Sequence, residues 1–236
     1  MSVTAVPERH IVSAYDQELD TLKRTLVEMA GIVETQVWNC SRAVVDRNPE
    51  LAKKAISDDK SVDARDRDVN DQTIRILALR QPMANDLRLI IAASKVSHSL
   101  ERIGDYAKNC AKRSLLLNQS DPLTNVAVVN QLSKEVLRVL RLAIDAFVEM
   151  DAEKARQAWL IDEQVDALHS ALFESTLAAM EAGTDPARPS AHLLFVSKNF
   201  ERMGDWATNI AEIVYFMITG DTLDGARPKA DSSSDG

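Results

Sequence analysis

Apolar residues recur every three or four positions along most of the chain, the spacing that gathers them on one face of an α-helix. A first stripe of this kind consists of Leu19, Leu22, Leu26, Met29, Val33, Val37, Cys40 and Val44. Asn48-Pro49 interrupts the stripe, because proline lacks an amide hydrogen and is well tolerated only in the first turn of a helix. The pattern therefore predicts one long helix that ends near Asn48 and a second helix over residues 49–79.

Similar breaks divide the rest of the chain, so that six helices are expected in all. Gln81-Pro82 and Asp121-Pro122 end the second and third helices, and Asp151 is a typical N-cap residue. The four remaining helices are expected over residues 85–117, 129–150 and 151–182, and from the loop at 186–189 to residue 219. Residues 221–236 are rich in Asp, Ser, Gly and Pro, and we expect this tail to be disordered.

The chain also repeats itself. Residues 101–111 read ERIGDYAKNCA and residues 201–211 read ERMGDWATNIA, which agree at seven of eleven positions. The segments DDKSVD at 58–63 and IDEQVD at 161–166 share a D-x-x-V-D pattern at an offset of 103. A repeated helical unit with short connections predicts an all-α protein made of two tandem three-helix bundles with antiparallel helices, over residues 8–120 and 121–220.

The composition agrees with this architecture and excludes several classes of function. Apolar residues make up 45% of the chain, while Gly and Pro number only seven each, a profile that suits long helices. The net charge of −8 argues against a nucleic-acid partner. No apolar run approaches the roughly 20 residues that a membrane span needs. The first residues do not resemble a signal peptide, and the two cysteines form no C-x-x-C motif, so we expect a cytoplasmic protein without membrane insertion.

Two pairs of acidic residues with a spacing of four occur in each half. These pairs are Asp59/Asp63, Glu101/Asp105, Asp162/Asp166 and Glu201/Asp205. Like charges at this spacing repel by roughly 0.2–0.5 kcal/mol, and a hard cation such as Mg²⁺, Mn²⁺ or iron would reverse that repulsion. About five such pairs are expected by chance among 36 acids, and these are usually solvated surface residues. The recurrence in both halves nevertheless favours a four-carboxylate metal site in each.

Neighbouring residues leave two interpretations open. Gly104 and Gly204 lie inside helices, either because two helices pack closely there or because a cluster needs room beside the backbone. Asn109 and Asn209 continue the acidic stripe by one turn, as metal ligands or as donors to the ligands. The four histidines form no Glu-x-x-His pair of the kind found in di-iron bundles, which argues against an oxidase.

Together these motifs resemble the PhoU family of phosphate-transport regulators. That family is marked by E-R-x-G-D-x-A-x-N in each of two repeats and by D/E-x-x-V-D on the preceding helix. Its Q-P-x-A-x-D-L-R segment is matched by QPMANDLR at 81–88, and the segment HIVSAYDQEL at 10–19 also fits. The resemblance covers about residues 8–220. The second half lacks the Q-P-x-A-x-D-L-R segment, so the two halves need not bind metal or partners equally.

The resemblance implies a fold and a function. It implies that the two bundles are related by a pseudo-twofold axis and that the acidic pairs hold Mg or Mn, or Fe or Zn. It also implies a negative regulator of the phosphate-starvation (Pho) response and of high-affinity phosphate uptake, without enzymatic activity. The implied partners are the ATPase subunit of the phosphate ABC transporter, a phosphate-sensing histidine kinase, and a second copy of the chain in a homodimer.

Two other functions compete with this one. A carboxylate-bound metal enzyme in a helical bundle would use the same acidic residues, but the chain shows no recognisable nucleophile motif. A structural scaffold with solvated acids would need no metal at all.

Overall fold

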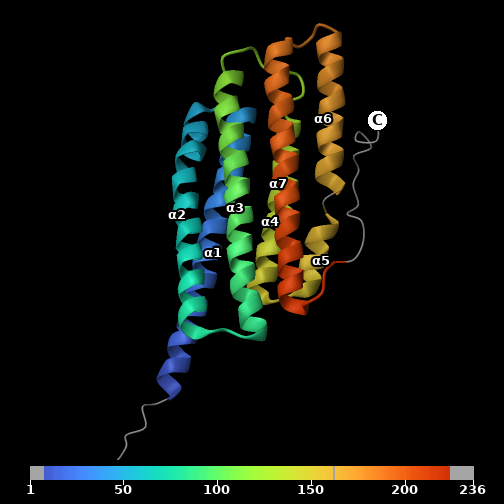
Figure 1. The fold of residues 1–236 in the computed structure, drawn as a ribbon. Coiled ribbons are helices and arrows are strands. Elements are labelled where there is room, and N and C mark those ends of the chain that lie inside the picture. Colours follow the sequence, from blue (N-terminus) through green and yellow to red (C-terminus); the bar gives the residue numbers. More distant parts are fainter. Residues whose placement is uncertain (1–7, 162, 224–236) are drawn as a thin grey trace, which may run out of the picture.

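The computed structural model describes residues 8–161 and 163–223, and all regular secondary structure within these ranges is α-helical (Figure 1). The helices are α1 (Glu8–Val45), α2 (Pro49–Arg80), α3 (Ala84–Leu117), α4 (Val128–Glu149), α5 (Ala152–Leu160), α6 (Glu163–Glu181) and α7 (Ala187–Thr219). The expected all-α class is therefore confirmed. The predictions for Asp162 and for the part of the tail at 224–236 lie outside the described residues.

Local signals in the sequence account for most helix ends. The Asn48 side chain accepts hydrogen bonds from the backbone amides of residues 50 and 51 at 3.0 and 3.3 Å, and Pro49 occupies the first turn of α2. Gln81 ends α2 in a left-handed conformation. The Asp151 side chain caps α5 through two backbone amides, and Gly220, with φ of +82°, ends α7. The predicted breaks thus fall where a side chain or a left-handed residue satisfies the last backbone groups.

The fifth helix was expected to be continuous over 151–182, and this expectation is wrong. The structure divides it into α5 and α6. At the end of α5 the amide of Ile161 donates to the carbonyl of Ala158 at 3.3 Å, a tighter turn than that of an α-helix. The nearby side chain of Trp159 is buried and donates from Nε1 to Glu212 Oε1 of α7 at 3.0 Å. This hydrogen bond holds α5 against α7. Because the helix ends directly after it, α6 does not have to continue along the axis of α5.

The helices form two bundles side by side. Helices α1, α2 and α3 make one bundle, α4 to α7 make the other, and α3 and α7 run antiparallel along the middle (Figure 1). The buried residues form one cluster that continues from one bundle to the other, with Leu100 of α3, Leu140 of α4 and Phe200 of α7 all at 0% exposure. The predicted domain boundary between 120 and 121 falls in the segment that joins α3 to α4.

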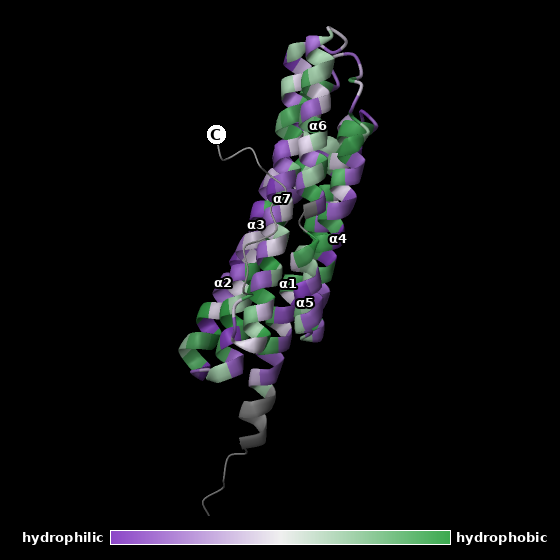
Figure 2. Cartoon of the chain, turned by 90° about the vertical axis from the view of Figure 1, so that its right-hand side faces the viewer, coloured by the Kyte–Doolittle hydropathy of each residue, from purple (hydrophilic) through white to green (hydrophobic). Residues whose placement is uncertain are grey.

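Every helix mixes hydrophilic and hydrophobic residues along its length (Figure 2). Among the described residues, none of the helices is both long enough and apolar enough to cross a bilayer.

Candidate functional site

The two repeated motifs contact each other inside each half. A Cβ atom built on Gly104 of α3 would lie 3.0 Å from Gln36 Oε1 and 3.3 Å from Val62 Cγ1. In the second half, a Cβ on Gly204 of α7 would lie 3.1 Å from Val165 Cγ1 of α6. The glycines belong to E-R-x-G-D and the valines to D-x-x-V-D, so the glycines serve close helix packing.

In the first half, two of the predicted carboxylates meet around a lysine. Lys108 Nζ lies 2.7 Å from Asp59 Oδ2 on α2 and 2.6 Å from Asp105 Oδ1 on α3. Burial alone would lower the pKa of Lys108, but the hydrogen bonds and charges of both carboxylates outweigh burial and hold that pKa well above its usual value. The lysine ammonium therefore links two of the four acids of the first half that the sequence suggested as metal ligands.

The negative charges of the other two acids of the first half, Glu101 and Asp63, are less well balanced by nearby cations. Burial and then the charge of Asp105 raise the pKa of Glu101, and the Arg102 guanidinium opposes that rise. Arg102 Nε lies 3.5 Å from Glu101 Oε2. Asp63 is half-buried and forms no hydrogen bond or ion pair with any residue that the structure describes.

Sequence reasoning missed a fifth acid in this group, Asp66. Its Oδ1 accepts a hydrogen bond of 2.6 Å from Ser97 Oγ, and its charge also contributes to the raised pKa of Glu101. At the equivalent place in the second half, His169 Nδ1 lies 2.7 Å from Ser197 Oγ. A serine stands four residues before each E-R-x-G-D string, Ser97 and Ser197, and this repetition could have pointed to a polar partner on the preceding helix. That partner is not repeated, because it is Asp66 in the first half and His169 in the second.

The second half holds its acids differently. Thr208 stands at the position of Lys108, is fully buried, and donates to the backbone carbonyl of Gly204 at 3.1 Å. Lys198 Nζ binds Glu201 Oε1 at 2.8 Å. The other oxygen of this carboxylate, Oε2, is buried and has no hydrogen-bond partner among the described residues.

The remaining predicted site residues are placed as follows. Asp166 on α6 and Asp205 on α7 are half-buried, and both make contacts within the protein. Asn109 is exposed on α3. Asn209 donates from Nδ2 to Ser99 Oγ at 3.0 Å, which joins α7 to α3. Among the side chains that the structure describes, at residues 14–161 and 164–223, no three of His, Cys, Asp or Glu form a group able to hold a metal ion. Metal binding thus stays a prediction.

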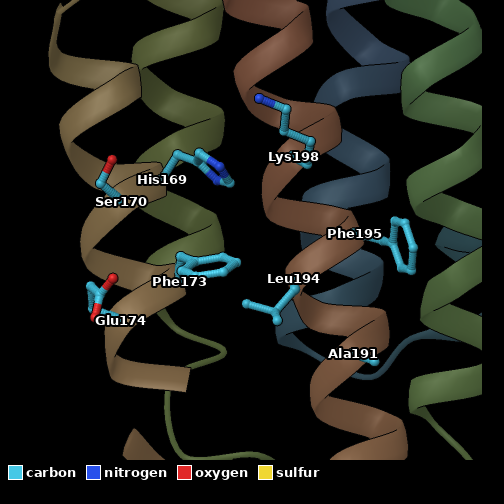
Figure 3. A pocket seen from close by; sticks show the side chains of 8 residues that line it. All are labelled: His169, Ser170, Phe173, Glu174, Ala191, Leu194, Phe195 and Lys198. Carbon is cyan, nitrogen blue, oxygen red and sulfur yellow. The ribbon is translucent and has the colours of Figure 1, made fainter. Parts of the chain in front are cut away.

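A groove of about 510 Å³ between α6 and α7 was not foreseen (Figure 3). His169 and Phe173 of α6 point toward α7, and Leu194 of α7 points back toward Phe173. Phe195 points instead toward α3, where the Arg113 guanidinium carbon lies 4.1 Å from its ring centroid. The groove is next to the hydrogen bond of His169 and therefore adjoins the acidic residues of the second half.

Comparison with known sequences finds the same repeat. The profile of the PhoU domain matches residues 26–114 and again residues 129–214. A phosphate-specific transport system accessory protein PhoU homolog of Caulobacter vibrioides (strain NA1000 / CB15N) is 41% identical over 223 residues, which are 94% of this chain and 97% of that protein. A homolog with the same description from Rhizobium meliloti (strain 1021) is 40% identical over 95% of each chain.

Solved structures agree with this likeness. The crystal structure of PhoU from Pseudomonas aeruginosa superposes with a TM-score of 0.84 at 31% identity, over 88% of this chain and all of that one. The phosphate transport system regulatory protein PhoU from Streptococcus pneumoniae superposes with a TM-score of 0.82 at 26% identity, over 89% of this chain and 99% of that one.

Proposed function

The chain belongs to the PhoU family of phosphate-transport accessory proteins, and from this premise we propose that it restrains the phosphate-starvation response and high-affinity phosphate uptake when phosphate is plentiful. The observation that carries the proposal is the match of both halves to the family, together with relatives similar along almost the whole chain. A regulator of this kind acts by binding other proteins, and needs no catalytic activity of its own.

The partners follow from the role. We propose that the protein is a cytoplasmic adaptor between the ATPase subunit of the phosphate ABC transporter and a phosphate-sensing histidine kinase, and that it acts as a homodimer. Two similar bundles side by side offer two distinct surfaces to two partners, which supports an adaptor.

A deletion experiment tests the regulatory role. Removal of the gene in phosphate-rich medium should raise a reporter of phosphate-uptake genes to the level seen in starvation. Expression of the intact chain from a plasmid should restore repression. An unchanged reporter in the deletion strain would contradict the proposal.

Metal ions at the acidic faces form the second part of the proposal. Carboxylate oxygens suit hard cations such as Mg²⁺, Mn²⁺ or iron. The second half fits such an ion better than the first, because the buried Oε2 of Glu201 lacks a hydrogen-bond partner among the described residues. Asp166 and Asp205, together with Asp162 outside the described part, would complete that site. In the first half an ion would have to displace Lys108 from Asp59 and Asp105.

Metal analysis distinguishes the two faces. The purified chain should bind Mn²⁺ or Fe²⁺ in equilibrium dialysis, and a Glu201→Ala/Asp205→Ala variant should lose more bound metal than Asp63→Ala/Glu101→Ala. Glu181→Ala, at an exposed site at the end of α6, serves as the control. Equal metal content in all variants would leave the acids as solvated surface residues. Turnover by the metal-loaded protein in oxidase or hydrolase assays would favour the metal enzyme instead.

A further inference from the structure

An open groove of about 350 Å³ lies between α3 and α7, at the end of the bundle where α3 begins and α7 ends (bottom of Figure 1). Its apolar lining includes Leu87 and Ile91 of α3 and Ile213 and Phe216 of α7. Leu87, Ile91 and Phe216 remain 39%, 39% and 44% exposed. Ile91 is ten residues from Glu101, or about 15 Å along the helix, so the apolar part of the groove lies away from the carboxylates, while Asn209 borders it on the side of the acidic residues.

The α3 margin of this groove is basic, although the chain as a whole carries a net charge of −8. Arg88 and Lys95 line it, and neither forms an ion pair with a carboxylate in the part of the chain that the structure describes. The acid on the opposite α7 margin, Glu212, accepts a hydrogen bond from Trp159 Nε1 at 3.0 Å. Arg88 donates from Nη2 to Asn85 Oδ1 at 2.7 Å, while its Nε is buried and has no acceptor among the described residues. A buried donor without an acceptor is unfavourable, and the two cations make this margin attractive to an incoming carboxylate.

The lining follows helical spacing on both sides. Leu87, Ile91 and Lys95 are four residues apart on α3, and Asn209, Ile213 and Phe216 are three or four apart on α7. Two antiparallel rows of this kind enclose the hollow that a third helix fills when its side chains pack between them. A flat lipid surface would contact only the rims, so the concave shape favours a helix over a membrane.

We propose that this groove is a docking site for an amphipathic helix of a partner protein. That helix presents Leu, Ile or Phe side chains to Ile91 and Phe216, and Asp or Glu side chains to Arg88 and Lys95. The inference rests on the proposed function only in assuming a protein partner. Its test measures peptide binding and the function's test measures gene expression, so either can fail alone.

Selection from a displayed library of 18-residue helical peptides against the full-length protein tests the occupant. We expect enrichment of peptides with apolar residues at positions i, i+3 or i+4 and i+7, flanked by Asp or Glu. Synthetic copies of the enriched peptides are then titrated by fluorescence anisotropy. Enrichment of basic or uncharged peptides, or no enrichment, would overturn the proposal.

Variants locate the binding site. Ile91→Ser and Lys95→Glu should each weaken peptide binding about tenfold. Ile74→Ser, at a 65% exposed isoleucine on α2, and Lys60→Glu, at an exposed lysine on α2, should leave binding unchanged. A peptide whose facing Glu is replaced by Lys should regain affinity for Lys95→Glu. Binding that is insensitive to both groove variants would place the site elsewhere.

Lipid vesicles test whether a membrane surface, instead of a partner helix, occupies the groove. Sedimentation with phosphatidylglycerol vesicles should leave the wild-type chain in the supernatant. Pelleting that depends on Lys95 and Phe216 would assign the groove to a lipid surface and overturn the proposal.

Discussion

The two halves of the protein share a packing motif but compensate their acidic residues in different ways. In both, a glycine of the last helix lies against a valine of the preceding helix, Gly104 with Val62 and Gly204 with Val165. In the first half, Lys108 lies between two carboxylates, whereas Thr208 at the same position is buried and bonds to its own helix. Duplication therefore preserved a steric contact, while the charges around it diverged. The two halves therefore share their helix packing but differ in the groups that pair with their acidic residues.

A second difference concerns the helix that precedes the motif. In the first half, Arg80 near the end of α2 forms two hydrogen bonds of 2.9 Å with Glu18 of α1. Gly183 occupies the position of Arg80 in the second half, at the offset of 103, so that contact cannot form there. Grooves border helices in both halves, α6 in the second half and α1 and α2 in the first. The first half therefore has an interhelical ion pair that the second half lacks, and the predictions below test how the two halves differ.

The largest effect should come from the core that both halves share. Leu100 and Phe200 occupy equivalent positions and are both fully buried. Leu100→Ala should lower the free energy of unfolding by about 2–5 kcal/mol and Phe200→Ala by about 3–5 kcal/mol. Because the core is continuous, urea unfolding followed by tryptophan fluorescence and by circular dichroism should give one coincident transition for each variant. Two separate transitions would show that the halves unfold independently.

The next effect should come from the glycine contacts. A Cβ atom at Gly104 would meet both Gln36 of α1 at 3.0 Å and Val62 of α2 at 3.3 Å, whereas the three atoms nearest to a Cβ at Gly204 all belong to Val165 of α6, the nearest at 3.1 Å. Overpacking of this kind costs about 1–3 kcal/mol, and we expect Gly104→Val to fall at the upper end and Gly204→Val at the lower end.

Gly31→Val is the control for the glycine variants, because nothing lies within 4 Å of a Cβ at Gly31. Thermal unfolding of the three variants ranks them by their loss of stability. A larger loss at Gly204 than at Gly104 would contradict the tighter packing of the first half.

Lys108 should stabilise the first half by a smaller amount. Lys108→Met leaves Asp59 and Asp105 close together without their shared ammonium, which should lower stability by about 1–2 kcal/mol in the presence of a chelator. The same variant should bind Mn²⁺ more tightly than the wild type, since the competing cation is gone.

Lys112→Met, one turn further along α3 at an exposed position, is the matched control and should change neither quantity. Calorimetric titration measures the affinity. Unaltered Mn²⁺ binding in Lys108→Met would remove the first acidic face from the metal proposal.

The smallest effect should be the pH-dependent contribution of Glu18. The hydrogen bond from Arg80 lowers the pKa of Glu18, so the folded state holds the carboxylate more strongly than the unfolded chain does. The contribution is therefore present above the unfolded pKa near 4.5 and is lost as the pH falls through the folded value. Glu18→Gln should lower stability by less than about 1 kcal/mol at pH 7 and by a smaller amount at pH 3.

Glu181→Gln, at an exposed position on α6, should have no effect on stability at pH 7. Urea titrations at both pH values make the comparison. A loss of stability at pH 3 as large as that at pH 7 would show that Glu18 stabilises the fold by something other than its negative charge.

Much of the fold could be predicted because its signals are local. The breaks at Asn48-Pro49 and Asp151 depend on a cap or a proline within a few residues, and the structure places helix ends there. The division after Leu160 was missed because its immediate sequence contains neither Gly nor Pro. The contact of Trp159 with α7 that accompanies this division is a property of tertiary packing.

The candidate site could be predicted only in part, for a related reason. The spacing of Asp59 and Asp105 within their motifs indicated that the two helices present acids to each other, and the two carboxylates do share a partner. Lys108 was not singled out, because its role depends on the rotation of α3 against α2. Asp66 was missed because the repeat holds His169 there.

By itself, the sequence determined the helical class, most helix ends and the twofold repetition, because periodicity, capping and motif recurrence act over a few residues or are visible by direct comparison. Only the tertiary structure decided which charges meet, which helix stands apart from its neighbours, and where apolar side chains stay uncovered between α3 and α7. These properties depend on the rotation and register of packed helices, which one helix cannot specify without its neighbours.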